Sequence, residues 1–240
     1  MVGSPMSADA SQTCNICGGT AFSAGPAGRM TADGKSPHCI GCGSLERHRA
    51  NRLLFESLPL GFFSWRRALQ FSHDMAPSPG WFQHFEISIY GGANSLDLQR
   101  IDRADDAYDL VSLSHVFEFV PDDQAAFKEV VRILSPSGLI HLVLSQPDSR
   151  AKSLDFEAAT GTHGYFHLYG RDFAERFELS ARGLHLLIVA GHDPATGARE
   201  LTHLVAKSAA LLDAIRTALG HAAGLRALVG TDNDLDFRFV

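Results

Sequence analysis

The sequence predicts an α/β protein whose mostly parallel sheet is completed by an antiparallel hairpin and preceded by a small N-terminal zinc ribbon. Three observations carry this prediction. From about residue 67, short apolar runs alternate with segments of helical periodicity, which is typical of a sheet covered on both faces. The run 108–117 is apolar nearly throughout, as a central parallel strand should be. All four cysteines lie between residues 14 and 42, in two Cys-x2-Cys pairs.

The composition is that of a soluble globular protein with one main domain and a small appendage. The chain has 240 residues, of which 45% are hydrophobic and 20% are charged. It contains no run of about 18 apolar residues that could span a bilayer, and residues 1–13 lack the charged start and apolar stretch of a secretory signal. We therefore expect a cytoplasmic protein without a membrane partner, in which paired cysteines bind metal more readily than they form structural disulfides.

The formal net charge of −6 is unevenly distributed along the chain. Residues 1–67 hold seven Lys/Arg and four Asp/Glu, a balance of +3, whereas residues 68–240 have a balance of −9. Nucleic-acid-binding domains usually carry denser basic stripes with interleaved aromatic residues. The basic region is therefore interpreted mostly as solvated surface. We expect a small-molecule substrate rather than nucleic acid, and the oligomeric state stays open.

The two cysteine pairs are separated by 21 residues and have the spacing of a four-thiolate zinc site. A glycine follows each pair and permits the tight turn with positive φ that brings backbone N–H groups toward the sulfur atoms. Redox-active or free thiols are the alternatives, although two matched pairs argue against a redox motif. The predicted zinc ligands are Cys14, Cys17, Cys39 and Cys42.

The residues around the second cysteine pair connect this ribbon to the rest of the chain. The segment between the pairs is rich in Gly, Ala, Ser and Pro and is too short for a core, so metal binding must supply most of its folding free energy. Directly after the ribbon, "SLERHRANRLLFESL" (44–58) predicts a helix with Ser44 as its N-cap and leucines on its packed face. The ribbon either only stabilises the domain or also contributes to substrate selection.

The body of the chain is predicted to contain five strands, a closing hairpin and several helices. The predicted strands are 67–72, 85–90, a brief third strand over 94–98, 108–117 and 138–147. A short helix is expected at 79–85, and a longer crossover helix within 120–138 has an acidic start and a glycine beyond its end. A further helix is expected over 170–183, a hairpin over 185–191 and 200–208, and a last helix over 209–220.

These elements divide the chain into five parts. We expect a flexible tail at 1–12, the zinc ribbon at 13–43, a linking helix at 44–66, the α/β domain at 67–208 and a C-terminal helical extension at 209–240.

Three stretches carry a resemblance to a known family. "YDLVSLSHVFEFVPDDQAAFKEVVRILSPSGLIHLVLSQP" (108–147) resembles the fourth strand, helix and fifth strand of class I S-adenosylmethionine-dependent methyltransferases, in particular their type 11 group. "CIGCGSLERHR" (39–49) and "HLYGRDFAERF" (167–177) resemble the subset with an N-terminal ribbon. The resemblance implies a Rossmann-like fold, S-adenosylmethionine and zinc as cofactors, and methyl transfer to a small molecule or biosynthetic intermediate.

The same resemblance implies where the methyl donor binds. Asp97 stands where the family places an acid that accepts the adenine amino group, with Leu98 beside the ring. The sequence departs from the family at the usual Gly-x-Gly-x-Gly loop, where "SHD" (72–74) stands, and at the ribose-binding acid, where Tyr90 stands. The predicted cofactor-binding residues are Ser72, His73, Asp74, Tyr90, Asp97, Leu98 and Ser114.

Catalytic residues are expected where the predicted strands end, because ligands of open α/β sheets bind beyond the carboxyl ends of the strands. His115 lies at the end of the predicted strand within 108–117 and could position or deprotonate a hydroxyl or amine. His167 and Tyr169, with His163, could form a wall over the substrate, and Glu118 either contacts the substrate or caps the next turn. Two alternatives to a small-molecule methyltransferase stay open: a methyltransferase-like binding protein with a decayed donor site, and an RNA methyltransferase.

Overall fold

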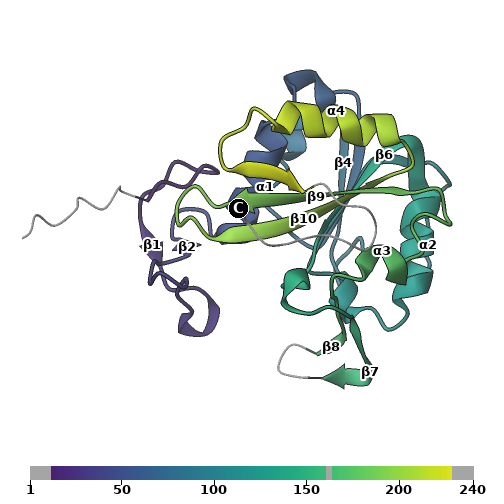
Figure 1. Ribbon diagram of the computed structural model, residues 1–240, viewed down its shortest axis with the longest axis horizontal. Helices are drawn as coiled ribbons and strands as arrows, with labels where there is room; N and C mark the ends of the chain where they lie inside the picture. The colour runs from purple at the N-terminus through teal and green to yellow at the C-terminus, as the bar shows by residue number, and fades with distance from the viewer. Residues whose placement is uncertain (1–11, 161–163, 229–240) are drawn as a thin grey trace, which may run out of the picture.

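The computed structural model describes residues 12–160 and 164–228 and contains a central sheet of seven strands (Figure 1). The strand order is β11-β9-β10-β6-β5-β3-β4. Strands β3 to β6 are mutually parallel, and β9 to β11 add an antiparallel edge. The strands are β3 (Arg67–Phe71), β4 (His84–Ser88), β5 (Tyr108–Ser114), β6 (Leu134–Val143), β9 (His185–His192), β10 (Arg199–Ala206) and β11 (Leu225–Leu228). The predicted fold class is confirmed.

Helices cover both faces of this sheet (Figure 1). The helices α1 (Glu46–Glu56) and α4 (Ala209–Leu219) share one apolar core with the sheet, whereas α2 (Asp123–Ile133) and α3 (Phe173–Arg176) share the other. All seven residues of β5 are buried because it lies between these two layers. No helix among the described residues is both long and apolar enough to cross a membrane.

Two small antiparallel sheets lie outside the central one. In the ribbon, β1 (Phe22–Ser23) pairs with β2 (His38–Cys39), and in the second half of the chain β7 (Leu154–Thr160) pairs with β8 (Tyr165–Leu168). Figure 1 shows the ribbon at one side of the sheet and the β7–β8 hairpin projecting from the body. Within residues 12–160 and 164–228, five single-turn helices complete the elements: η1 (Pro26–Gly28), η2 (Leu60–Phe62), η3 (Pro79–Trp81), η4 (Phe117–Phe119) and η5 (Pro147–Ser149).

The start of α1 differs from the prediction. Leu45 rather than Ser44 is the N-cap residue, and the backbone N–H of Leu45 donates to Nδ1 of His48 at 3.0 Å. The Ser44 hydroxyl is not available for capping because it contacts the sulfur atoms of Cys14 at 3.4 Å and Cys42 at 3.3 Å. Ser44, which local sequence rules assign to the helix as its N-cap, therefore contacts the cysteine cluster of the ribbon instead.

One predicted strand is absent from the described residues, and two predicted helices are shorter than expected. The stretch 94–98 forms no strand, because the carboxylate of Asp97 accepts the N–H of Gln99 at 2.9 Å and turns the chain, leaving an isolated bridge from Asp97 to Arg100. The helix expected over 170–183 is limited to α3, and a left-handed Glu178 (φ 49°) lies beyond its end. The helix expected at 79–85 is the single turn η3.

The end of the described chain belongs to the central domain. Besides α4, the predicted C-terminal extension contains β11, which pairs with β9 at the edge of the sheet. Residues 229–240 and the predicted tail over residues 1–11 lie outside the described residues.

Candidate active site and metal centre

The carboxyl ends of β3, β5 and β6 are marked by unusual backbone conformations. After each of these strands, one residue other than glycine has a positive φ. Ser72 (65°) directly follows β3, His115 (52°) directly follows β5, and Gln146 (46°) is the third residue after β6. Left-handed conformations of this kind cost about 1–3 kcal/mol each and cluster at functional sites. Ser72 and His115 were predicted site residues, whereas sequence reasoning missed Gln146, for which no local signal exists.

His115 is held firmly at this edge. Its backbone N–H donates to the carbonyl of Val143 at 2.9 Å, and its Nδ1 lies 2.8 Å from the hydroxyl of Ser145. The fully buried carboxylate of Glu118 accepts the backbone N–H of Ser145 at 2.7 Å, and its Oε1 lies 3.8 Å from Nδ1 of His115. The other ring nitrogen, Nε2, makes no hydrogen bond to the described part of the chain, so it is the atom free to meet a ligand.

Burial shifts the pKa values of His115 and Glu118. It lowers the pKa of His115 to about 4, and the positive charge of Arg47 acts in the same direction. Burial also raises the pKa of Glu118 above its usual range. At neutral pH the imidazole of His115 is therefore uncharged and can accept a proton.

Helix α1 brings two further side chains to this edge. His48 is buried, which lowers its pKa to about 4, and it responds to the charges of Asp74, Arg47 and His73. Asp74 and Arg47 also act on His115. We call Arg47, His48, His73, Asp74 and His115 the edge cluster. Neither Arg47 nor His48 was predicted as a site residue, because only tertiary packing places α1 against the end of β3.

Several buried polar atoms near this edge have no hydrogen-bond partner among the described residues. They are Arg47 Nε, Gln70 Oε1, Asp74 Oδ2 and Glu118 Oε2. Buried polar groups are normally paired, so the unpaired atoms at this edge are available to a polar ligand. This observation fits the charged amino-acid end of S-adenosylmethionine, the cofactor predicted from the sequence.

The remaining predicted cofactor residues lie in different environments. Tyr90 is 99% exposed just beyond β4, Ser114 ends β5, and Leu98 is 5% exposed in the core shared with α2. Asp97 is exposed, and of its two carboxylate oxygens only Oδ1 bonds within the described chain, to the N–H and side-chain amide of Gln99. Its other oxygen stays available to a ligand.

His167 and Tyr169 are buried in a hydrogen-bonded junction. His167 contacts the carbonyl of Val120 at 2.9 Å and the carboxylate of Asp155 at 2.7 Å. The hydroxyl of Tyr169 donates to the carboxylate of Asp123 at 3.0 Å, and burial raises its pKa. These contacts join β8 to the start of α2. The catalytic role of both residues stays a prediction, and His163 lies outside the described residues.

The four cysteine sulfur atoms form a compact cluster. All four lie within 4.8 Å of one another, with 3.7 Å between Cys14 and Cys42 and 3.6 Å between Cys17 and Cys39. A tetrahedral zinc ion with Zn–S bonds of about 2.3 Å requires S–S separations of ~3.8 Å. Gly18 (φ 74°) and Gly43 (φ 76°) close equivalent turns after each pair. The arrangement fits the predicted four-thiolate site.

A fully buried ion pair anchors the ribbon to the body. Arg49 donates from Nε and Nη2 to the two carboxylate oxygens of Asp193, at 2.8 and 2.6 Å, in the turn between β9 and β10. It also donates to the carbonyls of Ser44 and Pro37, both at 2.9 Å. Sequence reasoning missed this pair, whose partners are 144 residues apart.

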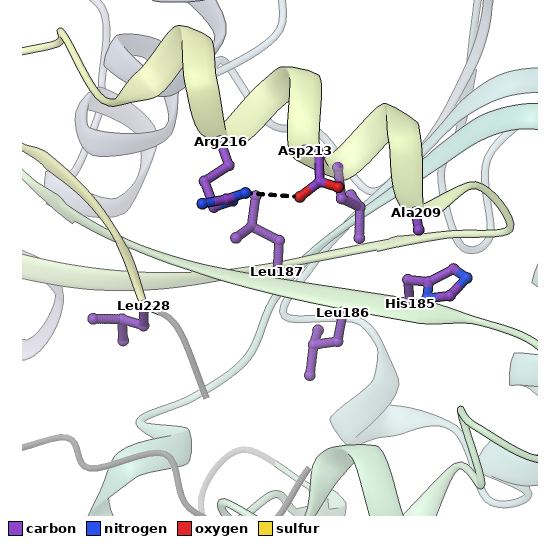
Figure 2. A pocket seen from close by; sticks show the side chains of 8 residues that line it. His185, Leu186, Leu187, Ala209, Asp213, Arg216 and Leu228 are labelled. Carbon is purple, nitrogen blue, oxygen red and sulfur yellow. Dashed lines mark hydrogen bonds and ion pairs between the residues drawn. The ribbon is translucent and has the colours of Figure 1, made fainter. Parts of the chain in front are cut away.

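A pocket of about 220 Å³ lies elsewhere, between β9, α4 and β11 (Figure 2). Figure 2 shows Leu186, Leu187 and Leu228 along it and the ion pair between Asp213 and Arg216 above it. His185, at the start of β9, pairs with Ala206 at the end of β10. The pocket therefore lies at the opposite ends of the strands from the edge cluster. None of the predicted site residues lines it.

Comparison with known proteins adds a family match. Residues 85–142 match the sequence model of a family described as a methyltransferase domain. The matched segment comprises nearly all of β4 and β6 and the whole of β5 and α2. It supports the prediction of an S-adenosylmethionine-dependent methyltransferase. No curated protein sequence matches the chain significantly.

Several solved structures are similar to the chain at low sequence identity. An S-adenosylmethionine-dependent methyltransferase of Thermotoga maritima shares 11% identity, with 67% of this chain and 89% of that chain covered and a TM-score of 0.43. One of Methanosarcina mazei shares 14%, covering 64% and 94%, with a TM-score of 0.39. The trans-methyltransferase CalH, in complex with S-adenosylhomocysteine, shares 17%, covering 66% and 57%, with a TM-score of 0.43.

Proposed function

We propose that the protein is an S-adenosylmethionine-dependent methyltransferase acting on a small molecule or biosynthetic intermediate, with a structural zinc ribbon. One observation carries the proposal: the segment that matches the methyltransferase family contributes β4 and β5, whose carboxyl ends border the edge cluster. Ligands of open α/β sheets bind at this edge. The absence of the glycine-rich loop is compensated by polar side chains that have no partner within the described residues.

The proposed chemistry assigns one role to His115. Bound S-adenosylmethionine would supply an electrophilic methyl group. His115 is uncharged at neutral pH and would accept a hydrogen bond at Nε2 from the acceptor hydroxyl or amine and take its proton. The acceptor's electron pair would form the new bond to the methyl carbon as the methyl–sulfur bond breaks, with S-adenosylhomocysteine as the leaving group. Ser145 and Glu118 fix the ring from the other side, which satisfies the need for orientation in an in-line displacement.

The donor would be held by the predicted cofactor residues. We assign the adenine amino group to the free oxygen of Asp97, and the ribose to the exposed Tyr90 beyond β4. Ser72, His73 and Asp74 replace the usual glycine-rich loop, and Ser114 lies at the end of β5 beside His115. Leu98 supports this site from the core.

The zinc ribbon would be structural. The S–S separations suit zinc, and the ribbon has no apolar core of its own, so the metal would supply its folding free energy. The basic residues within 13–43 have partners: Arg29 pairs with Glu46 and Lys35 with Asp33. Cations paired in this way contribute little to binding a polyanion, which favours a small-molecule acceptor over RNA.

Calorimetric titration tests the donor site. We expect the purified protein, shown by metal analysis to hold one zinc ion per chain, to bind S-adenosylmethionine and S-adenosylhomocysteine with micromolar affinity. The Asp97→Ala variant should lose about tenfold or more because the adenine amino group loses its acceptor. Asp102→Ala is the matched control, since Asp102 is a nearby exposed acid.

Three outcomes are decisive. Binding that Asp97→Ala weakens and Asp102→Ala does not would support the proposal. Failure of the folded, zinc-loaded protein to bind either ligand would overturn it in favour of a methyltransferase-like binding protein. Salt-dependent binding of RNA by the same sample would contradict the small-molecule acceptor.

A further inference from the structure

A row of polar side chains crosses the sheet beneath α1. Gln70 on β3, Ser112 on β5 and His141 on β6 are paired in register. His141 contacts the hydroxyl of Ser112 at 2.9 Å and the side-chain oxygen of Asn51, on α1, at 2.8 Å. Two residues earlier on the same strands, this face of the sheet is apolar and packs in the core shared with α1 and α4. The face therefore becomes polar toward its carboxyl edge.

Gln70 lies at the end of this row, and only one of the two polar groups of its side-chain amide makes a hydrogen bond within the described chain. Its Nε2 donates to the carbonyl of Ser72 at 2.9 Å, which fixes the orientation of the amide. Its Oε1 is buried and accepts no hydrogen bond from the described residues. An acceptor left in this state is satisfied when a ligand supplies a donor.

Asp74 presents a second unused acceptor at the same edge. It is 6% exposed, and its Oδ1 accepts the backbone N–H of Ala76 at 2.7 Å. Its Oδ2 is buried without a partner among the described residues. The loop that carries Asp74 is held to α1, because Arg52 donates to the carbonyl of Met75 at 2.8 Å.

Arg47 presents an unused donor and a positive charge. It lies one helical turn before Asn51, whose side-chain amide donates to the carbonyl of Arg47 at 2.8 Å. The Nε of Arg47 is buried and has no acceptor among the described residues, whereas Arg49 on the same helix is fully paired. Arg47 and Asp74 both act electrostatically on His48 and His115, so they flank the same imidazoles.

We propose that Arg47, Gln70 and Asp74 form a subsite for an α-amino acid head group, with Arg47 binding its carboxylate and the oxygens of Gln70 and Asp74 binding its ammonium group. One unused cationic donor and two unused acceptors at the same edge are complementary to a zwitterion of this kind. The inference rests on the proposed function, because the methionine part of the methyl donor is such a head group.

This subsite gives the ribbon a role in donor binding. Arg47 lies on the first turn of the helix that follows the second cysteine pair, and the same helix is tied to the ribbon by Arg49. Side chains from α1 and β3 would then replace the backbone contacts that a glycine-rich loop makes with the donor. The ribbon would hold one half of the subsite in place.

Paired titrations with two ligands test the subsite. S-adenosylhomocysteine carries the amino-acid head group, whereas 5′-methylthioadenosine has the same nucleoside and sulfur without it. In the folded, zinc-loaded protein, Arg47→Gln should weaken binding of S-adenosylhomocysteine by about 30-fold or more and leave 5′-methylthioadenosine unchanged. Arg216→Gln, which changes an exposed arginine of α4 paired with Asp213, is the control and should change neither affinity.

A second variant keeps the test decisive if Arg47→Gln does not fold. Asp74→Asn has the same shape, but it removes the negative charge, so it should also weaken binding of S-adenosylhomocysteine selectively. Equal losses for both ligands, or unchanged affinity for S-adenosylhomocysteine in a folded variant, would overturn the subsite while the donor site stands. Failure of the unmodified protein to bind either ligand would overturn the proposed function and the subsite together.

Discussion

At the scale of single residues, the carboxyl edge of the sheet combines strained backbone with side chains of shifted pKa. Ser72, His115 and Gln146 hold positive φ values although each carries a Cβ atom. The N–H of Ser72 donates to Ser88 at 2.8 Å, and that of His115 donates to Val143 at 2.9 Å. The neighbouring strands therefore keep these residues in place, which is consistent with a site that needs its side chains preset.

Gln146 allows this strain to be measured. Its side chain makes no hydrogen bond within the described chain, while its carbonyl accepts the N–H and the hydroxyl of Ser149. Gln146→Gly and Gln146→Ala both remove the side-chain amide, but only glycine adopts φ of 46° without a steric penalty. We expect the glycine variant to have the larger free energy of unfolding, by about 1 kcal/mol, in urea titrations. Equal or lower stability of the glycine variant would contradict strain at this position.

At the scale of elements, α1 is the connection between the ribbon and the body. Arg49 is fully buried and binds the ribbon through the carbonyls of Pro37 and Ser44 and the β9–β10 turn through Asp193. Asp193 in turn accepts the hydroxyl of Thr196 at 2.6 Å and the N–H of Ala195 at 3.1 Å. One ion pair thus orients three elements.

Breaking this pair from one side should be costly. Asp193→Ala leaves the guanidinium of Arg49 buried without its counter-charge, so we expect a loss of about 3–5 kcal/mol in the free energy of unfolding, measured by chemical denaturation. Asp213→Ala removes one partner of the exposed ion pair with Arg216 and should change stability by less than about 1 kcal/mol.

A double variant separates the ion pair from the packing around it. In Arg49→Leu combined with Asp193→Ala, no unpaired charge remains, so it should be less destabilised than Asp193→Ala alone. A double variant that is as unstable as the sum of the single variants would show that the two residues act independently.

At the scale of the whole molecule, the buried His48, His141 and His203 and the partly buried His115 couple stability to pH. Burial lowers the pKa values of His48, His115, His141 and His203 to about 4. In the unfolded chain these groups titrate near pH 6.5, so between about pH 6.5 and 4 the unfolded state binds more protons than the folded state. Their contribution to stability is complete above about pH 6.5 and is lost as the pH falls.

This linkage predicts that the free energy of unfolding falls steeply as the pH is lowered from about 6.5 to 4. Each histidine adds up to about 1.4 kcal/mol per pH unit to the slope of the free energy of unfolding between pH 6.5 and 4. In urea titrations at pH 7.5, 6 and 5, His141→Gln should flatten this slope by about one proton, whereas His221→Gln, at an exposed position, should leave it unchanged. An unchanged slope for His141→Gln would mean that His141 is already protonated in the folded protein.

The overall architecture could be predicted because its signals are local or periodic. The apolar run of β5, the amphipathic α2 with Asp122 as N-cap, and the β9–β10 hairpin each lie close to their predicted positions. The strand over 94–98 and the helix over 170–183 failed because a turn at Asp97 and a left-handed Glu178 end regular structure there. Helix and strand propensities averaged over several residues do not predict where a single residue ends an element.

By itself, the sequence determined the α/β class, the two paired cysteine motifs and the position of His115 at the end of a buried strand. Hydrophobic periodicity and cysteine spacing need only neighbouring residues to be informative. Only the tertiary structure decided that Arg47 of α1 and Asp74 beyond β3 both lie near His115, and that Arg49 pairs with Asp193. The physical reason is that buried charges and orphaned polar atoms are defined by partners distant in the chain, and packing alone brings those partners together.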